Sequence, residues 1–114
     1  GVETYRRMVG EFEQACAEIG RNPATVRRSW CGGCACAPTE AAAKRLAGDR
    51  FSTDKEDDFG FVGTPQQIVE QMRPFIALGV DYFMVDCPGF PDLTTLELLV
   101  HEVLPALKES GKQR

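Results

Sequence analysis

The sequence predicts an α/β fold in which two parallel strands alternate with helices. Three observations support this fold class. Residues 27–37 and 80–87 have the composition of short buried strands. Several other segments carry apolar side chains at helical spacing and end at a glycine. The order is helix, strand, helix, helix, strand, helix, and strands separated by helices usually pair in parallel through crossover connections.

The first half of the chain contains two predicted helices and the first strand. Apolar side chains recur every three or four positions over residues 3–18, which predicts a helix that ends at Gly20. The segment 27–37 follows and is rich in cysteine, glycine and alanine. A short helix is then expected between an N-cap at Thr39 and a stop at Gly48.

The middle of the chain contains a charged segment and a helix. Residues 49–60 are acidic towards their end and predict a solvent-exposed loop, with an active-site lid as the alternative. A helix is expected at 63–79, where Thr64 is the N-cap and Gln67 closes a capping box. Pro74 should kink its last turn, because proline cannot donate a backbone hydrogen bond.

The last third of the chain contains the second strand and the final helix. The strand at 80–87 is apolar enough to predict burial on both faces. Asp92 is expected to cap a final helix from Leu93 to about Lys108, with His101 on its polar side. The apolar stripe expected to face the core consists of Leu96, Leu99, Val100, Val103 and Leu107.

Composition and charge exclude several classes of function. The net charge of -4 and the pI near 5.0 argue against nucleic acid or an anionic membrane as partner. The apolar runs are far shorter than the roughly 20 residues of a membrane span. The first residues are too charged for a signal peptide. Five cysteines without an export signal favour reduced thiols and a cytoplasmic location.

The segment WCGGCACAPTE, residues 30–40, contains three of the five cysteines. It could be a metal site, a redox pair or a strand of small residues. Side chains alternate along a strand, so Cys31 and Cys34 would point to opposite faces. They could share a zinc ion only if Gly32 and Gly33 folded into a tight knuckle. Cys34 and Cys36 share a face, but a Cα separation of about 6.6 Å is at the limit for a disulfide. We favour a strand without metal, in which free cysteine packs as a small hydrophobe.

Four stretches, GRNPATVRRS, APTEAAA, FVGTPQQIVEQMRPFIALGVDYFMVDCPGFPDL and EVLPAL, together resemble the C-terminal end of the luciferase-like monooxygenases. The most specific features are GTP at residues 63–65, GVD at 79–81 and PGFP at 88–91. That family consists of flavin- or deazaflavin-dependent oxidoreductases on a (β/α)8 barrel. The resemblance therefore implies a partial TIM barrel, comprising about the last two βα units of eight.

The resemblance also implies a set of site residues. Catalytic groups of such barrels lie at the carboxyl ends of strands. Here those ends are Cys36 and Asp86, which Cys87 and Phe90 follow. We expect these four residues to form a wall of the substrate and flavin pocket, with no catalytic residue among them. For Asp86 the alternative is a loop cap or a solvated carboxylate, and for Phe90 it is loop anchoring.

Cofactor and partners follow from the same resemblance. A full-length member would bind FMN or a deazaflavin, mostly through earlier strands that this sequence does not contain, so the isolated chain is expected to bind neither. One interpretation is the C-terminal portion of such an enzyme, which would pair with the missing N-terminal portion of the barrel. The alternative is a free-standing, non-catalytic domain that self-associates or binds a longer homologue. Two strands leave open sheet edges, so we expect a homodimer with Trp30, Phe83 and the last helix near the contact.

Overall fold

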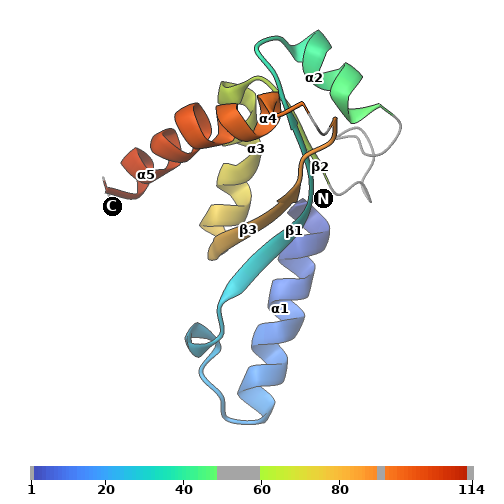
Figure 1. Cartoon of the computed structure of the whole chain (residues 1–114). Helices are drawn as coiled ribbons and strands as arrows, with labels where there is room; N and C mark the ends of the chain where they lie inside the picture. Colours follow the sequence, from blue (N-terminus) through green and yellow to red (C-terminus); the bar gives the residue numbers. More distant parts are fainter. Residues whose placement is uncertain (1, 49–59, 90–91, 113–114) are drawn as a thin grey trace.

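The computed structural model describes residues 2–48, 60–89 and 92–112 (Figure 1). Within these residues three parallel strands form one sheet, in the order β2-β1-β3. The central strand β1 (Arg28–Cys36) lies between β2 (Gly60–Gly63) and β3 (Val80–Asp86). The α/β class and the strand at the cysteine-rich segment are thus confirmed.

The prediction of two strands is wrong, because β2 is a third strand. It occupies the end of the segment that we assigned to a loop and the first residue assigned to the following helix. Four residues are too few for a recognisable alternating pattern. The strand forms because the carboxyl half of β1, from Gly33 to Cys36, has an edge to which β2 can pair.

The helices begin and end close to the predicted positions. Thr39 and Thr64 are the N-caps of α2 and α3, and the capping box between Thr64 and Gln67 is present. Pro74 lies inside α3, as expected. The described helical segments are α1 (Val2–Glu18), the 3-10 turn η1 (Pro23–Thr25), α2 (Glu40–Ala47), α3 (Pro65–Ala77), α4 (Thr94–Leu98), the π-helical η2 (Leu99–Val103) and α5 (Leu104–Lys112).

The hydrophobic core lies on one face of the sheet, between the strands and the helices α3 and η2. An aromatic cluster forms its centre. The ring centroids of Trp30 and Phe61 are 4.3 Å apart, and those of Phe61 and Phe75 are 5.7 Å apart. Ile68 and Val103 are fully or almost fully buried beside them. Tightly packed rings of this kind contribute beyond their buried area, so this cluster fixes how α3 sits on the sheet.

The strand β3 lies at the edge of the sheet and is not buried on both faces as predicted. Phe83 and Val85 pack against the core, whereas Tyr82 and Met84 are exposed on the other side. A parallel strand normally has helices on both faces. Among the described residues no helix covers this side of β3, so its apolar composition does not correspond to burial here.

The final helix also differs from the prediction. It consists of α4, η2 and α5 in succession, with a π-helical turn in the middle. Leu96 and Val100 were assigned to the inner stripe but are exposed, whereas Val103 is buried and Leu107 packs on the core as expected. The π turn contains more residues than an α-helical turn and shifts which side chains face inward.

Trp30, which we expected near a dimer contact, is buried in the core of its own chain. Nor are both edges of the sheet fully open. The side-chain amide of Gln71 on α3 donates to the carbonyl of Val62 at 2.8 Å and accepts from its N–H at 3.1 Å. One side chain thus pairs both backbone groups of Val62 in the short strand β2.

Candidate functional site

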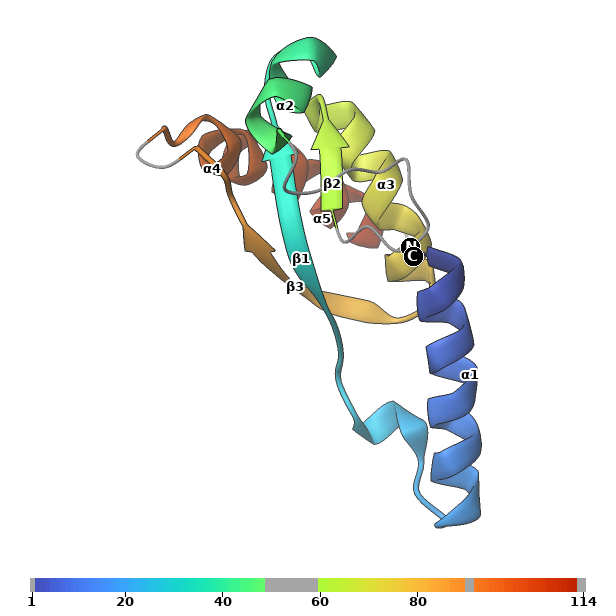
Figure 2. The same cartoon turned by 90° about the vertical axis from the view of Figure 1, so that its right-hand side faces the viewer.

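The carboxyl ends of β1 and β3 lie at one end of the sheet, where α2 packs beside β1 and β2 (Figures 1 and 2). This is the end at which the sequence predicted a pocket wall. The parallel register pairs Ser29 with Tyr82 and Cys31 with Met84, and all four residues are exposed. We call this set, together with Asp86, the open face of the sheet.

The two strands end at different levels. The last residue of β3, Asp86, pairs with Gly33, while β1 continues to Cys36. Beyond Asp86 the α4 residue Thr95 replaces β3 as the neighbour of β1. Its Oγ1 accepts a hydrogen bond from the Cys36 N–H at 3.0 Å and donates one to the Cys36 carbonyl at 2.9 Å. The end of β1 is thereby closed by the last helical segment.

The predicted pocket residues Cys36 and Cys87 lie near each other, but only one of them is accessible. Cys36 is fully buried, whereas Cys87 is half-buried. Burial raises the pKa of the Cys36 thiol to about 11, and the negative charges of Glu102 and of an ionised Cys87 add to the increase. Cys87 has a raised pKa for the same main reason, with Asp86 adding to it.

The environment of these thiols keeps them in the neutral form. Burial also raises the pKa of Cys34, and the nearby Cys36 and Cys87 reinforce the shift. A nucleophilic cysteine needs a lowered pKa and a positive neighbour. Cys34 and Cys36 therefore act as small packing residues, which is the role that the strand interpretation gave them.

All five cysteines are free in the structure, and Cys31 and Cys34 lie on opposite sides of β1, the first exposed and the second buried. In the part of the chain that the structure describes, no group of histidine, cysteine or acidic side chains has the arrangement of a metal site.

Asp86 is exposed at the end of the open face. It lies on the side of Tyr82 and Met84, opposite Phe83 and Val85, as the alternation of side chains along a strand requires. Phe90, the fourth predicted pocket residue, lies outside the described residues. Most of the predicted loop at 49–60 does so as well.

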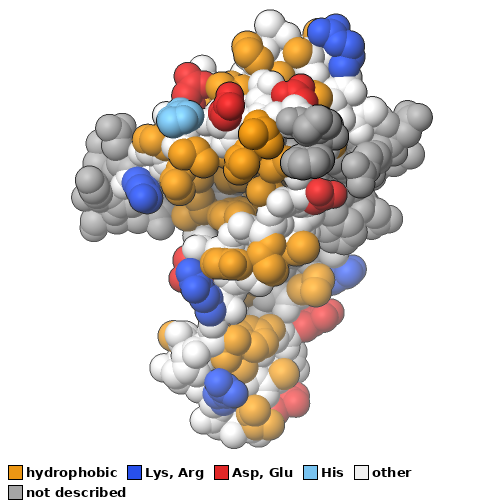
Figure 3. Space-filling view, viewed as in Figure 1, with side chains coloured by type: hydrophobic (Ala, Val, Ile, Leu, Met, Phe, Trp, Pro, Cys, Tyr) orange, Lys and Arg blue, Asp and Glu red, His pale blue; other side chains and the backbone are white. Residues whose placement is uncertain are grey.

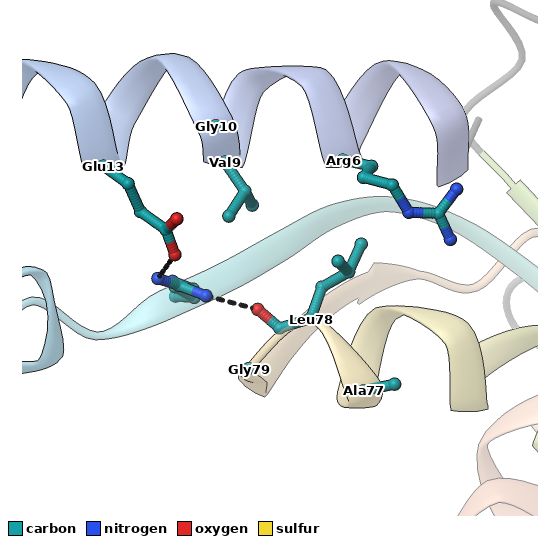
Figure 4. A pocket seen from close by; sticks show the side chains of 8 residues that line it. Arg6, Val9, Gly10, Glu13, Ala77, Leu78 and Gly79 are labelled. Atoms are coloured by element: carbon teal, nitrogen blue, oxygen red, sulfur yellow. Dashed lines mark hydrogen bonds and ion pairs between the residues drawn. The ribbon is translucent and has the colours of Figure 1, made fainter.

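A hollow of about 490 Å³ lies at the opposite end of the sheet, between α1 and the turn that precedes β3 (Figure 4). Arg28 crosses it. Its guanidinium donates to Glu13 Oε1 at 2.9 Å and to the Leu78 carbonyl at 2.6 Å. With its charge paired in this way, Arg28 joins α1 to the sheet.

Sequence reasoning missed two residues that organise these ends, Thr95 and Arg28. Thr95 stands beside Thr94 at the start of a helix, where a hydroxyl normally predicts capping and not a bridge to a strand. Arg28 is the first residue of β1, a strand for which the sequence-based predictions concerned only the cysteines and Trp30. A polar residue on the inner side of a predicted helix was the available signal for Thr95.

The Gly63–Thr64 step at the start of α3 serves as a cap. The Thr64 N–H donates to Gln67 Oε1 at 2.9 Å, and Thr64 Oγ1 accepts from the Gln67 N–H at 3.4 Å. A phosphate at a helix N-terminus needs such N–H groups to be available. The Thr64 and Gln67 N–H groups are already paired, so this step acts as a helix cap and not as a phosphate site.

No family model matches the chain, and no curated protein matches it significantly. Among the described residues, no helix combines the length and apolar character that a bilayer crossing requires.

Proposed function

We propose that this chain is the C-terminal portion of a luciferase-like, flavin- or deazaflavin-dependent oxidoreductase, folded as about the last two βα units of a TIM barrel. Its role would be to supply a wall of the substrate pocket, while most of the flavin cradle would come from preceding strands. The sequence resemblance suggests the family, and the open face of the sheet is the observation that carries the proposal.

The two faces of the β1–β3 pair differ as the faces of a barrel strand do. One face packs on helices through Trp30 and Phe83. The other presents Cys31, Tyr82 and Met84 to solvent. In a barrel the helices surround the sheet, and the opposite face is filled by side chains of the remaining strands. An open apolar face is therefore what a detached barrel segment would present.

The position of Asp86 supports the same role. Barrel enzymes place their functional side chains at the carboxyl ends of strands, and Asp86 and Cys87 are at that end of β3. An exposed carboxylate beside Met84 could contact a polar group of a substrate whose apolar part lies on the open face. Cys36 does not line this surface itself, because it is buried in the core, and it would support the pocket wall by packing beneath it.

One feature departs from a regular barrel. The strand β2 occupies the edge of β1 where a preceding barrel strand would pair, although only along Gly33–Cys36. The amino half of β1 has no partner on that side among the described residues. A complete barrel would therefore need to pair there or to displace β2.

The described residues do not fit a complete flavin site. The amides of Thr64 and Gln67 at the start of α3 are used in the capping box, so that helix offers no free cradle for the phosphate of FMN. The open face could contact a planar ring through Tyr82 and Met84, but it is a wall and not an enclosed pocket. We therefore assign this chain no step of the redox chemistry.

The native polypeptide tests the proposal. Its mass and its optical spectrum should be measured after purification from the organism that encodes it. The proposal expects a polypeptide approaching the length of a complete barrel, about 250 residues, that binds FMN or a deazaflavin. A native polypeptide near 12.6 kDa that binds neither cofactor would overturn it.

The second candidate is a free-standing, non-catalytic domain that acts by self-association or by binding a longer homologue. The exposed apolar side chains of the last helical segment, Leu96 and Val100 among them, favour this candidate. The same mass measurement distinguishes the two, because only the second candidate expects a polypeptide of this size.

A further inference from the structure

The last helical segment carries an apolar stripe on its outer side. Four large side chains recur at spacings of three, four and four residues, and each is 46–50% exposed. They are Leu93, Leu96, Val100 and Leu104. We call this set the outer stripe. It spans about 16 Å at the helical rise per residue. Figure 3 shows hydrophobic side chains gathered over α4 and α5, with the histidine at the edge of the patch.

The π-helical turn explains why these side chains share one side of the helix. Repeated spacing of four residues drifts around an α-helix, which has 3.6 residues per turn. The turn from Leu99 to Val103 is wider, since its hydrogen bonds span five residues. Steps of four therefore keep Leu96, Val100 and Leu104 in line.

The outer stripe is additional to the face that this helix already uses in its own chain. Val103 is buried in the core, and Leu99 and Leu107 pack against it. The segment is thus apolar on two sides. A helix that is apolar on more than one side is normally covered on more than one side, and a contiguous exposed patch of large side chains marks an interaction site.

We propose that a second copy of this chain covers the outer stripe, with the two final helices antiparallel about a two-fold axis near Leu98 and Leu99. The spacing of the stripe is self-complementary in this arrangement. Leu93 of one copy lies opposite Leu104 of the other. Leu96 of one copy is offset by one residue along the helix from Val100 of the other. A two-fold contact requires one patch to match itself in this manner.

The same two-fold axis also brings together complementary polar residues that lie beside the stripe. Glu97 and His101 are both exposed and lie one helical turn apart. The antiparallel arrangement brings Glu97 of one copy next to His101 of the other, so the carboxylate can accept a hydrogen bond from the imidazole. The contact occurs twice because of the symmetry. This match favours a second copy over an unrelated apolar partner.

Sedimentation equilibrium of the full chain at micromolar concentration tests the contact. The expected mass is twice 12.6 kDa. Val100→Glu places a carboxylate in the middle of the stripe of each copy, and it should lower the association constant at least tenfold. Leu96→Lys is a second variant at the same surface. Circular dichroism should show that each variant keeps its helical content, because both positions are exposed.

Ile19→Lys is the matched control. Ile19 is 76% exposed just beyond α1 and away from the last helix, so this variant should remain a dimer.

A double variant that combines Glu97→Lys with His101→Glu tests the antiparallel orientation, because it exchanges the two polar groups that are expected to meet. Glu97→Lys alone should weaken the dimer, and the double variant should restore it. A folded wild-type monomer, a dimer that persists in both stripe variants, or a swap that restores nothing would each overturn the proposal.

Discussion

The hydroxyl of Thr95 pairs both backbone polar groups of Cys36, accepting from its N–H at 3.0 Å and donating to its carbonyl at 2.9 Å. Both residues are buried. The side chain thus continues the ladder of the sheet beyond the point where β3 ends. Buried backbone groups without a partner are costly, so this pair connects the fold of the sheet to the position of the last helical segment.

Thr95→Val should destabilise the protein through that pair. Valine keeps the shape of threonine but leaves the Cys36 N–H and carbonyl unpaired, at about 1–3 kcal/mol for each buried group. The urea midpoint of unfolding, followed by circular dichroism, measures the change. Thr95→Ser retains the hydroxyl and should recover most of the loss. A neutral Thr95→Val beside a destabilising Thr95→Ser would show that the methyl packing matters and the hydrogen bonds do not.

The sequence was most informative where a signal is local. The capping box at Thr64 and the alternation that separates Cys31 from Cys34 both depend on near neighbours, and both are confirmed. The strand β2 and the bridge of Thr95 depend on groups that are distant in sequence. A strand of four residues carries too little pattern to be recognised without its partner.

The candidate site shows the same division. The face of the sheet on which Asp86 lies follows from the alternation of side chains along β3. The burial of Cys36 did not, because it depends on α4 and on the final helix covering the end of β1. Leu96 and Val100 of the outer stripe were assigned inward because regular α-helical spacing was assumed, and a π turn changes that spacing.

Arg28→Met should destabilise the protein more than Arg27→Met. The Arg28 side chain is 21% exposed and joins Glu13 to the Leu78 carbonyl, which connects α1 to the turn before β3. Hydrogen bonds to a charged group contribute about 1.5–3 kcal/mol. Arg27 pairs with Asp81 in solvent, where an ion pair contributes about 0–1 kcal/mol. Urea unfolding of both variants compares their free energies of unfolding. Equal losses would contradict the role of Arg28 in joining α1 to the turn before β3.

The thiols should react with an aromatic disulfide reagent in a fixed order at mildly alkaline pH. Cys31 is exposed and should react first, and the half-buried Cys87 more slowly. Cys34 and Cys36 should react only after unfolding, because burial and a raised pKa keep them as protected thiols. Cys31→Ser should remove the fast phase. A fast phase that survives in this variant would show that the sheet opens readily.

Stability should fall as the pH rises above about 8.5, the ordinary pKa of a cysteine thiol. The folded chain holds Cys36 as a thiol up to about pH 11, whereas the unfolded chain ionises earlier. The stabilisation is therefore complete below the unfolded pKa and is lost as the pH approaches the folded one. Urea midpoints of the parent and of Cys36→Ala should converge over this range. A constant difference between them would contradict the assignment.

Gly63→Ala and Gly10→Ala should change stability in opposite directions. Gly63 has a φ of +154°, and a Cβ there would lie 2.8 Å from the Cβ of Gln67 and against its side-chain oxygen. The alanine would strain the backbone and disturb the Gln67 contact that closes the capping box of α3. Gly10 lies inside α1, where nothing stands within 4 Å of an added Cβ. Alanine there should stabilise the helix by about 0.5–1 kcal/mol. Urea unfolding of both variants decides the matter, since a neutral or stabilising Gly63→Ala would mean that the glycine is not required for the start of α3.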